Sequence, residues 1–117
     1  MEKYSVGAYN DIRGMEAGMD AHHVGQKALM KEFIPDYYAM TAPAILVPRI
    51  GHKIKGPSGI FSRGVDGLKS PRDVLARDVR ELRRVYPDIP NATLQHLIRM
   101  NKEAYPGAFG KTSYDVK

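Results

Sequence analysis

Two prolines bound an apolar run in Pro43-Ala44-Ile45-Leu46-Val47-Pro48, near the middle of the 117-residue chain. A short apolar run bounded in this way predicts a buried strand. Proline has no backbone N–H to donate to a neighbouring strand, so the two prolines mark the strand's ends. The sequence therefore predicts a short strand at residues 44–47, around which the remaining elements are arranged.

A helix is predicted from about Pro71 to Tyr86. Ser70 is a suitable N-cap, and Asp73 stands at the position of a capping box. Four residues lie on one apolar face, and charge pairs four residues apart are expected on the outside. The apolar residues are Leu75, Val79, Leu82 and Tyr86, and the charge pairs are Asp73 with Arg77 and Arg77 with Glu81.

A second helix is predicted from Asn91, as its cap, to about Ala104, where Pro106-Gly107 ends it. The link at residues 87–90 is short, so the two helices should form an antiparallel hairpin. With the strand, these helices predict an α+β, mostly helical fold. At this length the chain forms one domain, with no cysteine to cross-link it.

The segment before the strand admits two interpretations. Asp20 can cap a helix that begins at Ala21 and ends before Pro35. Alternatively, residues 20–23 end an extended segment and the helix begins only around Gly25. Residues 1–19 are predicted to be a loosely structured lead-in, with one short turn or strand near Tyr4 to Tyr9, and residues 20–117 to be the domain.

The charge of the chain favours an anionic partner. The net charge is +5, and ten of the basic residues lie between Arg49 and Arg84, against four acidic ones. No apolar run is long enough to span a bilayer, and the first residues lack the apolar stretch of a secretory signal. No strongly amphipathic basic helix with exposed bulky apolar residues is evident, so no membrane partner is expected.

The candidate chemistry lies in Asp20-Ala21-His22-His23 and in His52 beyond the apolar run. Adjacent histidines point in different directions, so one can bind a metal while the other handles a proton. Phosphodiester hydrolysis needs an activated water and neutralised phosphate charge, which imidazole, carboxylate and a divalent cation supply. Basic residues on either side of His52 are candidates for binding phosphates: Arg49, Lys53, Lys55 and Arg63.

Each of these features also has an ordinary structural explanation. A histidine pair near a helix start is commonly solvated, and His52 between Gly51 and Lys53 is typical of a surface loop. Gly56 and Gly59 fit a turn better than a phosphate nest. His96 is interpreted as structural. Arginines 77, 80, 83 and 84 are interpreted as a solvated helix face.

Three segments together resemble the toxin domains of the HNH/endonuclease VII superfamily, and in particular their His-His subgroups at the C-termini of bacterial polymorphic toxins. The segments are residues 20–26 (DAHHVGQ), 42–48 (APAILVP) and 51–53 (GHK). Residues 4–9 are similar to the junction that precedes such a toxin tip, and residues 86–90 with the arginine-rich helix resemble the domain's C-terminal part.

The resemblance implies a small ββα-metal-like core, in which a β-hairpin and a helix hold one divalent metal, Mg²⁺ or Zn²⁺. His22 would be a ligand, His23 the general base and His52 a second ligand. The chain departs from the pattern in two ways: no asparagine lies between the pair and His52, and no histidine follows His52 by one or two helical turns. The third ligand is unassigned among Asp20, Ser62 and water.

We therefore expect a toxin domain with metal-dependent endonuclease activity, with DNA favoured over RNA as substrate. It would be delivered as the tip of a larger toxin, act in the target-cell cytoplasm and be covered by an acidic immunity protein. The alternatives are a metal-independent ribonuclease in which His22 or His23 shares acid and base roles with His52, a non-catalytic nucleic-acid-binding module, or a toxin of unrelated chemistry.

Overall fold

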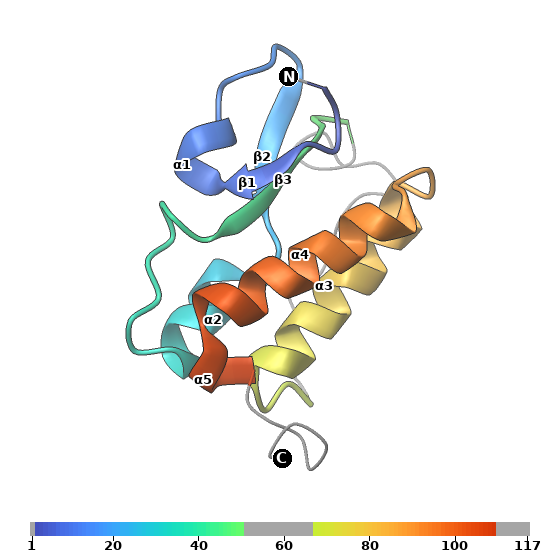
Figure 1. Cartoon of the computed structure of the whole chain (residues 1–117). Helices are drawn as coiled ribbons and strands as arrows, with labels where there is room; N and C mark the ends of the chain where they lie inside the picture. Colours follow the sequence, from blue (N-terminus) through green and yellow to red (C-terminus); the bar gives the residue numbers. More distant parts are fainter. Residues whose placement is uncertain (1, 51–66, 110–117) are drawn as a thin grey trace.

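The computed structural model describes residues 2–50 and 67–109, and it places a small sheet beside a group of helices (Figure 1). The sheet contains β1 (Val6–Ala8), β2 (Met19–His23) and β3 (Pro43–Pro48), in the order β1-β3-β2. Both pairings are antiparallel. The α+β, mostly helical class predicted from the sequence is confirmed.

The central strand is β3, whose residues 43–47 are buried. Val6 lies opposite Ile45 in β1, and His22 lies opposite the same residue in β2. A strand paired on both sides has most of its backbone polar groups satisfied, which allows an apolar sequence to be buried. The strand predicted between the two prolines is confirmed.

Each face of the sheet is covered by different elements. Ile45 and Val47 join the large core cluster formed with the helices. Ala44 and Leu46, which point to the other side, form a smaller cluster with Ile12 of α1 (Tyr9–Ile12). We call these two sides the helical face and the α1 face.

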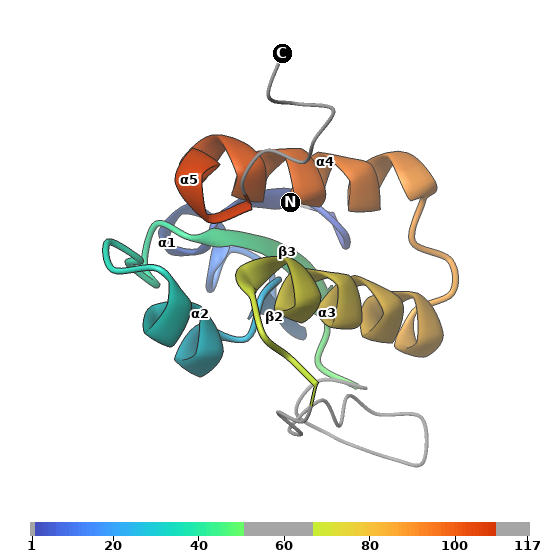
Figure 2. The ribbon, with the colours of Figure 1, turned by 90° about the horizontal axis from the view of Figure 1, so that it is seen from below.

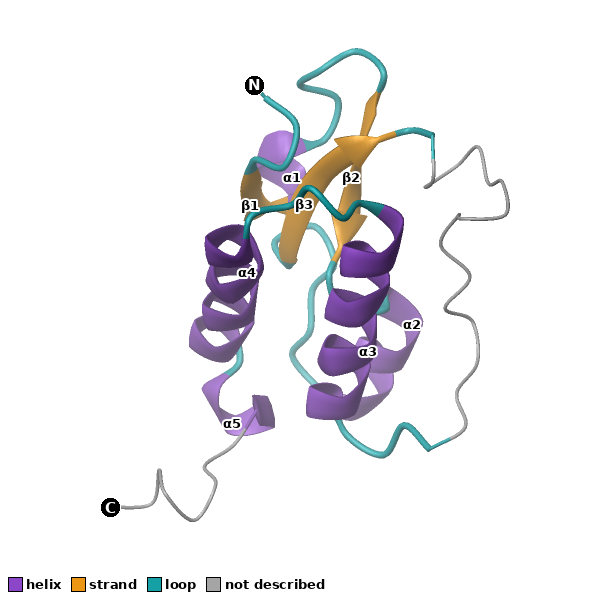
Figure 3. Cartoon of the chain, turned by 90° about the vertical axis from the view of Figure 1, so that its right-hand side faces the viewer, coloured by secondary structure: helices purple, strands orange, loops and turns teal. Residues whose placement is uncertain are grey.

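The helical hairpin is present, with α3 at Pro71–Val85 and α4 at Asn91–Ala104, followed by the short α5 at Pro106–Phe109. Figures 2 and 3 show α3 and α4 running in opposite directions along the helical face. The Ser70 side chain accepts a hydrogen bond from the Asp73 N–H at 3.2 Å, as a capping box requires. β2 and β3 pair antiparallel and α3 follows them in the chain, but α2 (Lys27–Phe33) lies between the two strands, so they are not joined by a short hairpin turn.

One predicted cap is wrong. The N-cap of α4 is Pro90, which offers no side-chain acceptor, and Asn91 is the first helical residue. The Asn91 side-chain oxygen instead accepts a hydrogen bond from Arg83, near the end of α3. Arg83 also donates to the carbonyl of Ile89, at 2.6 Å. The asparagine therefore helps to close the link between the two helices rather than to start the second.

The helix predicted from Ala21 is also wrong, because residues 19–23 form β2 and α2 spans only Lys27–Phe33. The alternative interpretation, an extended histidine pair followed by a later helix, is confirmed. Gly25 lies between strand and helix with φ +101, a conformation that L side chains rarely adopt. Because residues 19–23 pair with β3, the helical periodicity that begins at Val24 does not extend the helix back to Ala21.

Residues 2–19 are folded onto the rest of the described chain, which corrects the prediction of a loose lead-in. The expected short strand is β1, and it pairs with β3 over residues 6–8. The Tyr4 hydroxyl donates to Asp88 in the α3–α4 link at 2.6 Å, and Lys3 pairs with the same carboxylate at 3.0 Å. Within the described ranges, no helix combines the length and apolarity needed to cross a bilayer.

Candidate functional site

The histidine pair lies at the end of β2, an edge strand of the sheet. Successive side chains of a strand point to opposite faces. His22 lies opposite Ile45 and so faces the helices, whereas His23 lies opposite Ala44 on the α1 face. The two imidazoles therefore point to different sides of the sheet, as expected for adjacent histidines.

His23 is half-buried and held by two contacts. Its ring stacks on the Tyr9 ring, with centroids 4.3 Å apart and planes 16° from parallel. Its Nε2 atom lies 2.7 Å from the carbonyl oxygen of Ala39. A carbonyl only accepts hydrogen bonds, so Nε2 carries the proton that it donates. In the neutral imidazole, the lone pair is then on Nδ1.

The surroundings of His23 keep its imidazole neutral. Burial lowers the pKa of His23 below the ordinary value, and the positive charge of Lys27 lowers it further, while the hydrogen bond to Ala39 opposes both. At neutral pH the ring therefore carries one N–H, fixed by a carbonyl, and one free lone pair. That is the state of a group that can accept a proton from water.

Backbone hydrogen bonds join the elements around His23 into one unit. The N–H of Tyr9 donates to Ala42 at 2.9 Å, and the N–H of Asn10 donates to Met40 at 2.7 Å. The start of α1 is thereby tied to the same loop, residues 39–42, whose first carbonyl orients His23. Tyr9 lies in residues 1–19, which were predicted to be a lead-in outside the domain, so its contact with His23 was not predicted.

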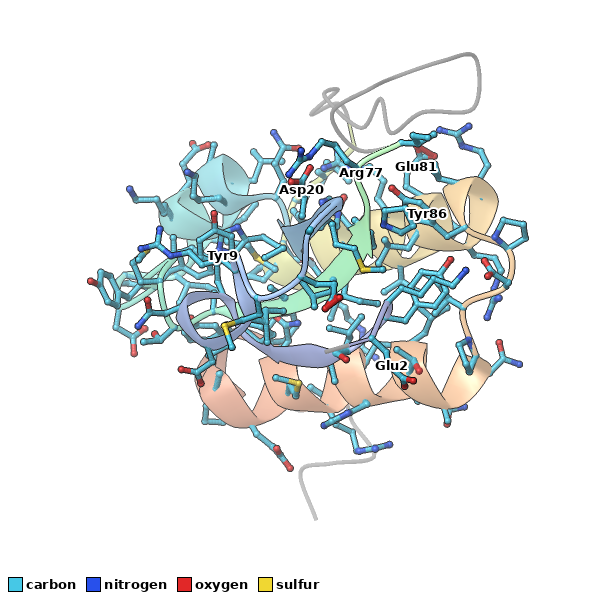
Figure 4. The ribbon with its side chains drawn as sticks, turned by 90° about the horizontal axis from the view of Figure 1, so that it is seen from above. Glu2, Tyr9, Asp20, Arg77, Glu81 and Tyr86 are labelled. Carbon is cyan, nitrogen blue, oxygen red and sulfur yellow. The ribbon has the colours of Figure 1, made fainter. Side chains whose placement is uncertain are left out.

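On the helical face, Asp20 lies two residues before His22, so both side chains point the same way. Asp20 is 8% exposed, and its Oδ1 accepts a hydrogen bond from Arg49 Nε at 3.3 Å. Burial and the charge of Asp20 raise the pKa of Tyr86 to about 12. In Figure 4, Asp20, Arg77, Glu81 and Tyr86 lie on one side, and Tyr9 lies apart from them.

The metal predicted from the resemblance is not accommodated by the described residues alone. Asp20 and His22 are suitable ligand types on one face, but no group of three His, Cys, Asp or Glu side chains able to hold an ion occurs in residues 2–50 and 67–109. The Asp20 carboxylate also pairs with Arg49, a predicted phosphate-binding residue. His52, Lys53, Lys55, Ser62 and Arg63 lie outside the described residues.

A buried carboxylate that was not predicted is Asp78 of α3, which is 5% exposed. Its Oδ2 accepts the Gly25 N–H at 3.0 Å, and its Oδ1 accepts from Arg77 Nε at 3.1 Å. Arg77 Nη2 in turn donates to the Gln26 side chain at 2.5 Å. Desolvation raises the pKa of Asp78, while Arg77 and the backbone N–H groups oppose that shift.

This network holds the turn between the histidine pair and α2. The prediction that Arg77 lies on the solvated outside of the helix is therefore wrong. Its side chain is 15% exposed and points to the turn. Arg80 and Arg84 are exposed, as expected for a solvated helix face. His96, which was interpreted as structural, is likewise exposed, on α4.

No protein-family model, curated protein or solved structure matches the chain in comparisons of sequence and fold.

Proposed function

We propose that this domain hydrolyses phosphodiester bonds of nucleic acid, with His23 as the general base. The observation that carries the proposal is the state of His23: a neutral imidazole whose Nε2–H is fixed by the Ala39 carbonyl at 2.7 Å. Its stacking on Tyr9 and half-buried position limit rotation of the ring. Nδ1 is then a proton acceptor in a defined direction.

In the proposed step, Nδ1 of His23 takes a proton from water as the water oxygen attacks phosphorus, and the ester oxygen leaves. A base with a pKa below the working pH is unprotonated and ready to act. The asparagine that the resemblance would use to orient the base is absent between the pair and His52. The Ala39 carbonyl supplies that orientation in its place, because it fixes both tautomer and ring direction.

A divalent cation remains part of the proposal as a separate element. Asp20 and His22 supply two ligand types on the helical face, and His52 is the further ligand that the resemblance implies. The side chains within residues 2–50 and 67–109 do not by themselves complete a site for the ion. The assignment of His23 stands on its own contacts and does not require His22.

The biological setting that we propose is a toxin tip that enters a target cell and is neutralised by an acidic immunity protein. The net charge of +5 supports both a nucleic-acid substrate and an acidic inhibitor. DNA is the favoured substrate, on the resemblance to HNH-type toxins.

The test is to incubate the purified chain with plasmid DNA and with total RNA, each with and without a chelator. We expect DNA cleavage that the chelator abolishes, and we expect His23→Ala to lower the rate by at least about 100-fold. The matched control is His96→Ala, which removes an exposed histidine on α4 and should leave the rate unchanged.

The outcomes separate the candidate functions. Equal rates for His23→Ala and the wild type would remove His23 from the mechanism. Cleavage of RNA in excess chelator, leaving a cyclic phosphate, would favour the metal-independent ribonuclease. Binding of nucleic acid without cleavage, unaffected by either substitution, would favour a non-catalytic module.

A further inference from the structure

Two cations near His23, Arg13 and Lys27, lie outside the basic segment at residues 49–84 of the sequence. The guanidinium of Arg13 lies over the Tyr9 ring, with Cζ 5.9 Å from the ring centroid. Tyr9 in turn stacks on His23. The Tyr9 ring therefore contacts both the His23 imidazole and the Arg13 guanidinium.

The backbone fixes Arg13 in this position. Arg13 is the C-cap of α1, and its N–H donates to the Tyr9 carbonyl at 3.0 Å. Tyr9 is itself tied to the loop at residues 39–42 through the Ala42 carbonyl. Arg13 is thus anchored to the loop that orients His23, although its side chain is exposed.

The second cation is Lys27, the exposed first residue of α2. It follows His23 by four residues, across the turn that Asp78 holds through Gly25. Neither Lys27 nor Arg13 has a carboxylate partner within residues 2–50 and 67–109, so both charges are available to an anion.

We propose that Arg13 and Lys27 bind backbone phosphates of the nucleic-acid strand next to the one at His23. Arginine and lysine are the residues that usually contact phosphate oxygens. This inference rests on the proposed function, because it places the scissile phosphate at His23. It adds phosphate contacts near His23. The phosphate-binding residues predicted from the sequence, in contrast, are Arg49, Lys53, Lys55 and Arg63.

An exposed aromatic ring on the same loop supports a nucleic-acid ligand. Tyr38 is 61% exposed and directly precedes Ala39, the residue whose carbonyl holds His23. Unpaired bases stack on aromatic rings of this kind, at roughly 1–3 kcal/mol per base. The combination of exposed cations and an exposed ring fits a single strand better than a protein surface.

The test measures binding apart from cleavage, in a His23→Gln background. The probe is a short fluorescein-labelled single-stranded DNA, and its affinity is followed by anisotropy over a range of salt concentrations. Arg13→Gln and Lys27→Gln should each weaken binding by roughly tenfold and reduce the slope of log K against log salt by about 1. Arg99→Gln, an exposed arginine on α4, is the matched control and should change neither quantity.

The two proposals fail in different ways. If Arg13→Gln and Lys27→Gln bind like Arg99→Gln, the phosphate assignment is wrong, even where the wild type cleaves DNA. Weaker binding with an unchanged salt slope would also overturn it, because a lost phosphate contact must lower the slope. If both variants behave as expected while the wild type cleaves nothing, the phosphate assignment stands and the proposed hydrolysis fails.

Discussion

The two faces of the sheet differ in how much of the molecule covers them. On the helical face, Ile45 and Val47 pack into the cluster that includes α3 and α4. On the α1 face, within residues 2–50 and 67–109, Ala44 and Leu46 form a much smaller cluster with the buried Ile12. The difference teaches that the proposed base is separated from the main core: the helical face holds that core, and the α1 face leaves His23 half-buried.

The polar residues follow the same division. Asp78 is buried on the side of the helices and takes part in a network with Arg77 and the Gly25 N–H. His23 on the α1 face is held by one ring and one carbonyl, which leaves one nitrogen for a reaction. Three pairs of substitutions test this comparison, from the largest expected effect to the smallest.

Truncating the central strand on each face should give the largest effects. Ile45→Ala should lower the free energy of unfolding by about 4 kcal/mol, because the large cluster around it cannot collapse into the cavity. Leu46→Ala should cost about 2–3 kcal/mol, because the thin cover of α1 can move inward. Urea unfolding followed by circular dichroism measures both. A larger loss for Leu46→Ala would contradict the division into thick and thin faces.

Removing the buried carboxylate should have the next largest effect. Asp78→Ala leaves the Gly25 N–H without its acceptor and removes the ion-pair partner of the largely buried Arg77, so we expect a loss of about 3 kcal/mol. Arg49→Ala breaks the half-exposed pair with Asp20 and should cost under about 1 kcal/mol. Thermal unfolding of both variants gives the comparison. Similar losses would mean that Asp78 does not hold the turn.

The smallest effect concerns pH. His23 has a lower pKa in the folded chain than the ordinary value of about 6.5 in the unfolded chain. Above that value both states are neutral, and below it the unfolded state binds the proton first, so stability falls as the pH decreases from about 6.5. His23→Gln should remove this part of the pH dependence.

The control for this prediction is His96→Gln, on the exposed surface of α4. Urea unfolding at about pH 7.5 and about pH 5.5 should give a smaller stability difference for His23→Gln than for His96→Gln. Equal differences in the two variants would show that His23 does not titrate in a buried setting.

The sequence predicted elements with strong local signals. Ser70 and Pro71 begin α3 where the capping pattern indicates, and prolines 43 and 48 bound β3 as expected. These signals act through neighbouring atoms, because a cap or a missing N–H affects the backbone within a few residues. The expectation that His22 and His23 point in different directions is also met, because side chains alternate in any extended segment.

The errors share a different cause, which is contact between residues far apart in the chain. Residues 19–23 form a strand because β3 pairs with them. The helical periodicity from Val24 onward had suggested that the helix begins earlier, at Ala21. Residues 6–8 gave no strong local signal for their pairing with residues 43–45. The contact of Tyr9 with His23 depends on both pairings, so nothing in the local sequence indicates it.

The central position of β3 has a consequence for the order in which the chain is synthesised. Both of its partner strands precede it in the sequence, so all three strands are available once residue 48 has left the ribosome. The helices that cover Ile45 and Val47 are completed only with residues 71–104. At a typical synthesis rate of about 5–20 residues per second, the nascent sheet therefore exposes an apolar surface for several seconds. A chaperone that binds apolar strands has its opportunity in that interval.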